Sequence, residues 1–148
     1  MVCKKNLPAY LGGNMIFFNW ENNYETGFEL IDKQHKDYII IVDQLQNSIV
    51  SHNKELFNKY SVEFLTHIHD HFVTENDLMI KHNYHGYFSH KAEHDRFYEK
   101  TKNNLANLYD KSTIEINLFF EVTYRWFRNH LDINDRKLAR FLIDNNLS

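Results

Sequence analysis

The sequence predicts an all-α protein, an up-down-up-down antiparallel four-helix bundle with an irregular N-terminal arm and a short C-terminal helix. One proline and four glycines in 148 residues interrupt the chain very little, which favours long helices. Apolar residues recur every three or four positions in four successive segments, and the sequence contains no alternating strand pattern. The connections between these segments are short, and short connections make successive helices antiparallel.

The first two predicted helices each start at a capping residue. The first starts near Asp32, which we expect to be its N-cap, and its apolar stripe is His35, Tyr38, Val42, Leu45 and Ile49. The second starts after Asn53, another expected N-cap. Its stripe is Phe57, Tyr60, Phe64, His67 or Ile68, His71, Glu75, Leu78 and Met79. Before them, residues 17–30 predict an irregular arm with Trp20 as its anchor.

The last three predicted helices follow a break at Gly86. The third has the stripe Tyr87, His90, His94, Phe97, Thr101, Leu105 and Leu108. Ser112 and Glu115 have the spacing of a capping box, which predicts the start of the fourth helix. Its face carries Phe119, Val122, Trp126 and His130. A short last helix is expected at residues 135–145.

Composition restricts the classes of function. A net charge of −3 provides no basic face for nucleic acid, and no apolar run approaches the ~20 residues of a membrane span. Cys3 is the only cysteine, so an internal disulfide is impossible and a reducing compartment fits. We expect a cytoplasmic protein with a flexible extension at residues 1–14 and one domain at residues 15–148. The sequence predicts no particular protein partner.

Six ionisable side chains lie on the predicted apolar stripes. An imidazole or carboxylate in a dry core costs several kcal/mol unless it is paired. A metal centre is the simplest common partner, because one cluster of cations satisfies every lone pair. The pairs His71/Glu75 and His90/His94 have the i,i+4 spacing that places two ligands on one helix face. The six residues are His35, His71, Glu75, His90, His94 and His130.

Asp135 is a seventh candidate ligand, five residues after His130. Five steps of a regular α-helix rotate it about 140° beyond a full turn, so the helix must end or loosen between residues 131 and 134. Seven ligands are too many for one closed zinc site, and two ions that share carboxylates use seven comfortably. A ferritin-like di-iron site needs Glu-x-x-His, which does not occur here.

These motifs resemble those of the hemerythrin family, and in particular of single-domain bacteriohemerythrins. The matching pieces occur in the family's order between residues 20 and 135: Trp20 with Gly27, "IDKQH" (31–35), "HFVTE" (71–75), "HKAEH" (90–94) and "WFRNHLDIND" (126–135). The resemblance implies two non-haem irons that reversibly bind O2. One iron would be held by His90, His94 and His130 and the other by His35 and His71. Glu75, Asp135 and an oxo or hydroxo oxygen would bridge them, which leaves one position open for O2.

The resemblance leaves the role of several residues and the exact function open. Trp126, Phe127 and Leu131 are candidates for lining the O2 pocket, or for plain core packing. Tyr38 stands where the family usually has an aliphatic residue, so its hydroxyl either faces the open iron or points elsewhere. His67 is expected outside the ligand set. An O2 or nitric oxide sensor and a redox enzyme acting on peroxide or nitric oxide are the alternatives to an O2 carrier, which is not an enzyme.

Overall fold

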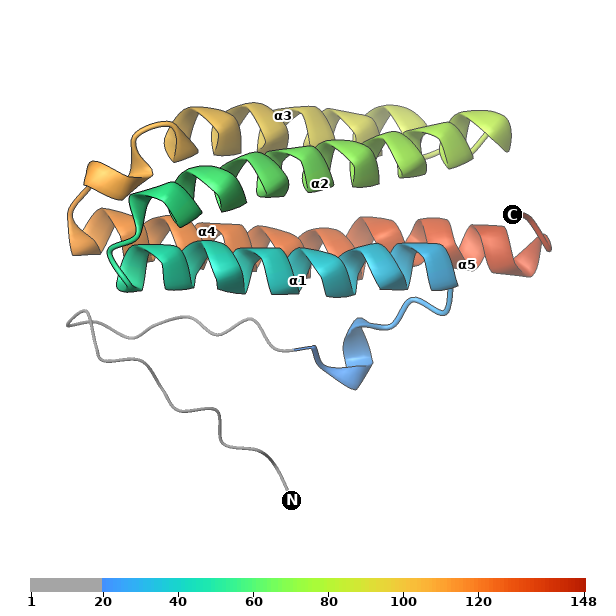
Figure 1. Ribbon diagram of the computed structural model, residues 1–148. Helices are drawn as coiled ribbons and strands as arrows, with labels where there is room; N and C mark the ends of the chain where they lie inside the picture. The colour runs from blue at the N-terminus through green and yellow to red at the C-terminus, as the bar shows by residue number, and fades with distance from the viewer. Residues whose placement is uncertain (1–19) are drawn as a thin grey trace, which may run out of the picture.

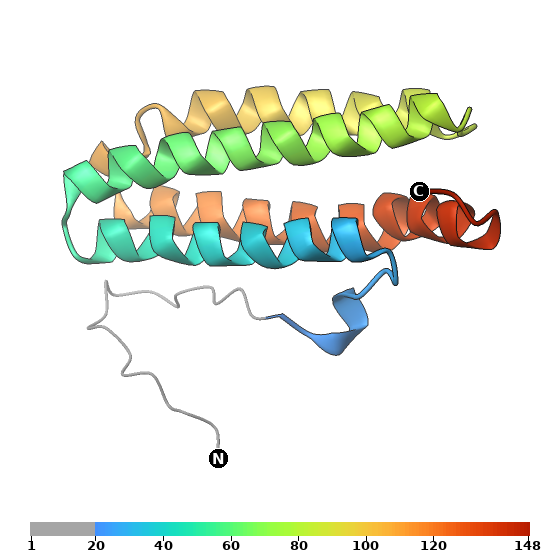
Figure 2. The same ribbon diagram turned by 45° about the vertical axis from the view of Figure 1, so that its right-hand side comes forward.

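Four long helices run antiparallel in the computed structural model, which describes residues 20–148 (Figures 1 and 2). The predicted flexible extension and Cys3 lie outside the described residues. Helices α1 and α4 form one layer of the bundle, and α2 and α3 form the other. The described part contains no strand, and the predicted fold class is confirmed. The bounds are α1 (Glu29–Val50), α2 (Lys54–Lys81), α3 (Tyr87–Leu105) and α4 (Thr113–His130).

Two of the predicted helix starts are confirmed by their caps. The side chain of Asn53 accepts a hydrogen bond from the backbone N–H of Leu56 at 3.0 Å, which caps α2. Ser112 and Glu115 form the predicted capping box at the start of α4. Both helices therefore begin where side-chain oxygens can satisfy their free N–H groups.

The prediction that Asp32 is the N-cap of α1 is wrong. The helix starts at Glu29, one turn earlier, and Asp32 lies inside it with its carboxylate directed back to the preceding turn. That carboxylate accepts hydrogen bonds from the backbone N–H and hydroxyl of Thr26, both at 2.7 Å, and from the N–H of Gly27 at 3.1 Å. Gly27 has φ +85°, a conformation that glycine adopts without strain. Asp32 thus stabilises the turn that leads into the helix.

The N-terminal arm packs against α1 and α4. The ring of Trp20 lies edge-on to Tyr24 at 5.7 Å, and the ammonium group of Lys36 lies over the indole at 4.9 Å. Tyr24 in turn packs edge-on against Phe127 of α4 at 5.9 Å. The guanidinium of Arg136 donates hydrogen bonds to the backbone carbonyls of Asn23 and Glu25. Contacts near Trp20 and near Glu25 therefore hold the described part of the arm against the bundle.

Helix α4 is joined to the C-terminal helix without a loop. It continues through a π-helical turn, η3 (Leu131–Asp135), directly into α5 (Arg136–Asp144), and Figure 1 shows the three segments as one rod. The predicted loosening between residues 131 and 134 is confirmed. The short C-terminal helix is also present, as a continuation of α4.

Two apolar clusters fill the bundle, one at each side of a layer of buried polar residues. The larger cluster includes Phe64, Ile68, Phe120 and Leu131, and the smaller one is Ile31, Leu78, Met79, Tyr84, Leu138 and Leu142. Among residues 20–148, no helix is long and apolar enough to cross a membrane. The polar layer is the feature of the core that needs a further explanation.

Candidate metal centre

All seven predicted ligands lie in one layer and are buried. Helix α1 supplies one histidine, α2 a histidine and a glutamate, and α3 two histidines, while α4 and η3 supply the last histidine and an aspartate. The exposed fraction is 6% or less for every one of them: His35, His71, Glu75, His90, His94, His130 and Asp135. Their ligand atoms form two groups within which all atoms lie within 4.8 Å of one another.

The first group contains five residues: Glu75, His90, His94, His130 and Asp135. The Nε2 atoms of His90 and His94 lie 3.0 and 2.9 Å from Nε2 of His130. Glu75 Oε2 is 3.2 Å from Nε2 of His90 and 3.1 Å from Nε2 of His94. Asp135 Oδ1 lies 3.1 Å from Nε2 of His90 and 3.0 Å from Nε2 of His130. All five donors therefore face a common point.

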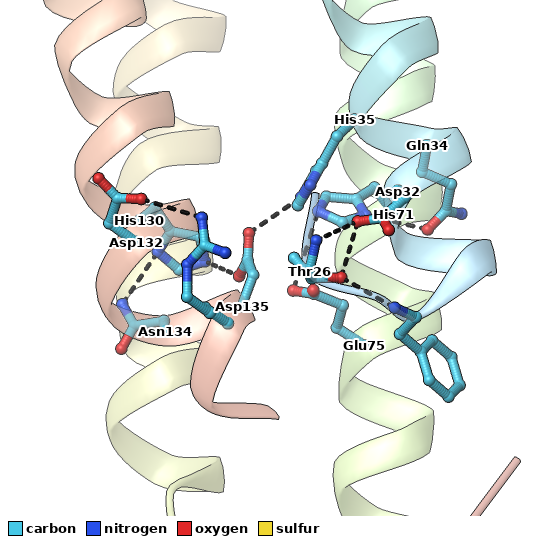
Figure 3. Close-up of polar contacts among 12 residues, drawn as sticks. Thr26, Asp32, Gln34, His35, His71, Glu75, His130, Asp132, Asn134 and Asp135 are labelled. Atoms are coloured by element: carbon cyan, nitrogen blue, oxygen red, sulfur yellow. Dashed lines mark hydrogen bonds and ion pairs between the residues drawn. The ribbon is translucent and has the colours of Figure 1, made fainter. Parts of the chain in front are cut away.

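The second group contains four residues and shares both carboxylates with the first: His35, His71, Glu75 and Asp135. Asp135 reaches across the bundle in Figure 3, and its Oδ2 lies 3.0 Å from Nε2 of His35. Its Oδ1 belongs to the first group, so each oxygen of Asp135 serves a different group. Glu75 faces both groups with a single oxygen, because the Oε2 that lies near His90 and His94 is also 3.8 Å from Nε2 of His71.

The spacing of the donors suits metal ions better than hydrogen bonds. A single N–H at Nε2 of His90 cannot serve Glu75, Asp135 and His130 at once. Within residues 20–148, both oxygens of Glu75 and Nε2 of His35 are buried without a hydrogen bond of good geometry. Neighbouring ligands about 2.1 Å from a shared ion are about 3.0 Å apart in an octahedron and about 3.4 Å apart in a tetrahedron. The observed distances of 2.9 to 3.2 Å in the first group fit octahedral coordination.

The π-turn is the element that completes the layer. In a π-helix the hydrogen bonds join residues five apart. Asp135 is therefore brought over His130, five positions earlier, instead of about 140° away from it. The same turn keeps α5 in line with α4, so that Leu138 and Leu142 still reach the smaller apolar cluster.

The electrostatics of the layer favour bound cations. Burial and the nearby Asp135 oppose ionisation of Glu75, but the imidazoles of His71, His90 and His94 hold its pKa below the usual range. Asp135 is also buried, and the nearby imidazoles of His130, His35 and His90 hold its pKa well below the ordinary value. Burial disfavours the imidazolium of His90, yet Asp135 and Glu75 raise its pKa to about 10. The pKa of His130 is also raised, by Asp135, whereas burial lowers the pKa of His71 and His94. Without metal, His90 and His130 are therefore the imidazoles whose protons balance the two carboxylates.

The outer nitrogens of two ligands have side-chain partners that the sequence did not predict. The Nδ1–H of His71 donates to Oε1 of Gln34 at 3.0 Å, and that of His130 donates to Oε2 of Glu93 at 3.0 Å. Such hydrogen bonds fix which nitrogen is left to bind metal. No sequence pattern reveals these partners, because both pairs join residues of different helices.

The predicted pocket residues divide between the two groups. Phe127 packs edge-on against His35 at 5.5 Å, and Tyr38 stacks on Phe127 with ring centroids 4.8 Å apart. Leu131 is fully buried. Trp126 instead stacks on His130 at 4.3 Å, in the five-residue group. Phe127 and Tyr38 therefore lie on the side of the four-residue group.

The remaining histidines of α2 lie outside both groups. Nε2–H of His67 donates to the backbone carbonyl of Gln34 at 2.9 Å, and burial lowers the pKa of this half-buried imidazole. His69 is exposed beside Asp70. Neither side chain belongs to the two groups of possible metal ligands found among residues 20–148.

Known proteins resemble this chain over most of its length. It is 29% identical over 127 residues to a bacteriohemerythrin of Clostridium acetobutylicum. The matched region covers 81% of this chain and 97% of that protein. Identity is also 29% over 126 residues to a bacteriohemerythrin of Aquifex aeolicus, with 81% and 93% covered. A myohemerythrin of Theromyzon tessulatum is 26% identical over 121 residues, with 81% and 89% covered. No family model and no solved structure matches the chain. Together with the bundle and its polar layer, these relatives confirm the predicted resemblance of the chain to the hemerythrin family.

Proposed function

We propose that this chain binds O2 reversibly at a non-haem di-iron centre, for the storage, delivery or scavenging of oxygen. The observation that carries the proposal is the unequal number of donors in two groups that share both carboxylates, five residues in one and four in the other. His90, His94 and His130 would hold one iron, and His35 and His71 the other. Glu75 and Asp135 would bridge the pair.

The difference of one donor would leave a position for O2 at the metal of the four-residue group. The five-residue group would need one further ligand from solvent for six-fold coordination, and the four-residue group offers one protein donor fewer. When bound, a pair of ferrous irons supplies the two electrons that capture of O2 requires. The protein's own contribution is to hold the donors in place, because all seven lie on helices packed in a bundle.

Apolar side chains next to the four-residue group would keep water and protons out. Phe127 lies edge-on to His35, with Tyr38 stacked behind it, and we propose the fully buried Leu131 as a further part of this lining. A dry site favours release of O2 over loss of its reduced form, since that loss needs protons from solvent. We assign Trp126 to support of His130, on which it stacks.

The comparisons support the same function, because relatives named bacteriohemerythrin are similar over nearly their whole length. We also propose that residues 15–148 form one hemerythrin-like domain and that the protein is cytoplasmic. A lone cysteine, Cys3, agrees with a reducing compartment.

Repeated oxygenation tests the carrier function against the redox alternatives. The iron-loaded protein is cycled between O2 and an inert gas while its visible spectrum is recorded. A carrier returns to the same two spectra over many cycles. Irreversible oxidation within a few cycles would instead indicate redox chemistry and overturn the proposal.

A further inference from the structure

A carboxylate contacts the outer nitrogen of His130. Its Nδ1–H donates to Oε2 of Glu93 at 3.0 Å, and Nδ2 of Asn134 donates to the same oxygen at 2.7 Å. Glu93 comes from α3, whereas Asn134 lies in the π-turn η3. Two hydrogen bonds therefore hold this carboxylate against the segment that supplies His130 and Asp135.

The corresponding partner in the four-residue group is neutral. His71 donates to the amide oxygen of Gln34, and the amide nitrogen of Gln34 donates to the hydroxyl of Thr74 at 3.1 Å. That hydroxyl donates onward to the backbone carbonyl of Asp70 at 2.8 Å. The two groups thus differ in the charge behind one imidazole as well as in the number of donors.

The outer side of the Glu93 side chain reaches solvent. Its side chain is 40% exposed, whereas that of His130 is only 2% exposed. Glu93 and Trp126 are among the residues that line a groove of about 630 Å³ between α3 and α4. Solvent in this groove hydrates the outer side of the carboxylate, so its charge does not bear the cost of full burial.

The ring of His130 is also fixed without Glu93. Trp126 stacks on it with an interplanar angle of 12° and stacks on Phe97 at 3.7 Å and 10°. The ring plane is therefore set by packing. What Glu93 adds is mainly negative charge, which strengthens electron donation from the ligating Nε2.

We propose that Glu93 acts through His130 as a positioning residue that favours the ferric state of the iron held by His90, His94 and His130. This inference rests on the di-iron function proposed above. A fixed negative charge one imidazole away stabilises a trivalent ion more than a divalent one. The neutral Gln34 gives the open iron no such stabilisation, so the two irons have unequal redox properties.

Glu93→Gln tests the proposal, because glutamine keeps an acceptor for Nδ1–H and removes the charge. In a spectroelectrochemical titration of iron-loaded protein, each ferric iron takes one electron from the electrode. We expect the variant to shift the ferric–ferrous equilibrium about tenfold toward ferrous at one iron, which is about 59 mV for a one-electron couple. Asp95→Asn is the matched control, because Asp95 is an exposed carboxylate on the same helix that pairs with Lys91.

The outcomes separate this inference from the proposed function. Wild-type protein that holds fewer than two irons refutes the di-iron function itself. Wild-type protein with two irons, and a Glu93→Gln potential equal to those of wild type and Asp95→Asn, refutes only the role of Glu93. Loss of iron from Glu93→Gln would reduce Glu93 to a structural support and also overturn the proposal.

Discussion

Removal of the proposed metal ions should lower the free energy of unfolding, and the number of unsatisfied ligand atoms gives the size of the effect. Three buried ligand atoms lack a good hydrogen bond in the described part of the chain: Glu75 Oε1, Glu75 Oε2 and His35 Nε2. An unsatisfied buried polar atom costs about 1–3 kcal/mol, so metal that coordinates all three recovers about 3–9 kcal/mol. For a domain of this size, 1 kcal/mol shifts the unfolding midpoint by about 2–4 °C. Chelation should therefore lower the midpoint by at least about 6 °C.

The assay is thermal unfolding followed by circular dichroism, with and without a chelator that strips iron. Glu75→Gln should abolish most of the difference between the two forms, because an amide bridges metal ions poorly. Glu63→Gln is the matched control on α2, since Glu63 is half exposed and pairs with Lys59 on the outer face of the same helix. It should respond to chelation as wild type does. A wild-type midpoint that chelation changes by less than about 2 °C would falsify the account of the polar layer.

Three further predictions concern other parts of the molecule. Asp32→Asn should lower the free energy of unfolding by about 2–3 kcal/mol in urea titrations, because a charged acceptor of three hydrogen bonds is lost. Its iron content should not change, and unaltered stability would contradict the role of Asp32. Metal uptake by the apoprotein should release protons in weakly buffered solution at pH 7, and apparent affinity should rise with pH. The reason is that His90, with its pKa raised to about 10, is protonated at pH 7 until metal displaces the proton; pH-independent affinity would refute it. Tyr38→Leu should slow autoxidation about fivefold, the effect of one hydrogen bond worth ~1 kcal/mol to departing reduced oxygen; an equal rate would show that this hydroxyl plays no part.

Periodicity and chemistry predicted most of the layer from the sequence. Imidazoles on apolar stripes could be read directly, because a helix places every third or fourth residue on one face. Asp135 was the informative exception. Regular geometry directs it away from His130, and only a local departure from the α-helix, found as the π-turn η3, brings the two together.

The sequence could not predict which groups outside its own helix a polar side chain contacts. Asp32 resembled an N-cap because it precedes the apolar stripe, yet its carboxylate serves the turn at Thr26 and Gly27. Glu93 and Gln34 occupy positions that resemble ordinary polar surface. Their roles depend on which imidazole of another helix lies within hydrogen-bond distance, and that follows only from packing.

The stoichiometry of O2 uptake tests the central claim most directly. Iron content and bound O2 are measured on the same sample of reduced protein. An open position at only one of two metal groups predicts one O2 for every two irons. One O2 per iron, or none at saturating oxygen, would contradict the arrangement of five and four donors.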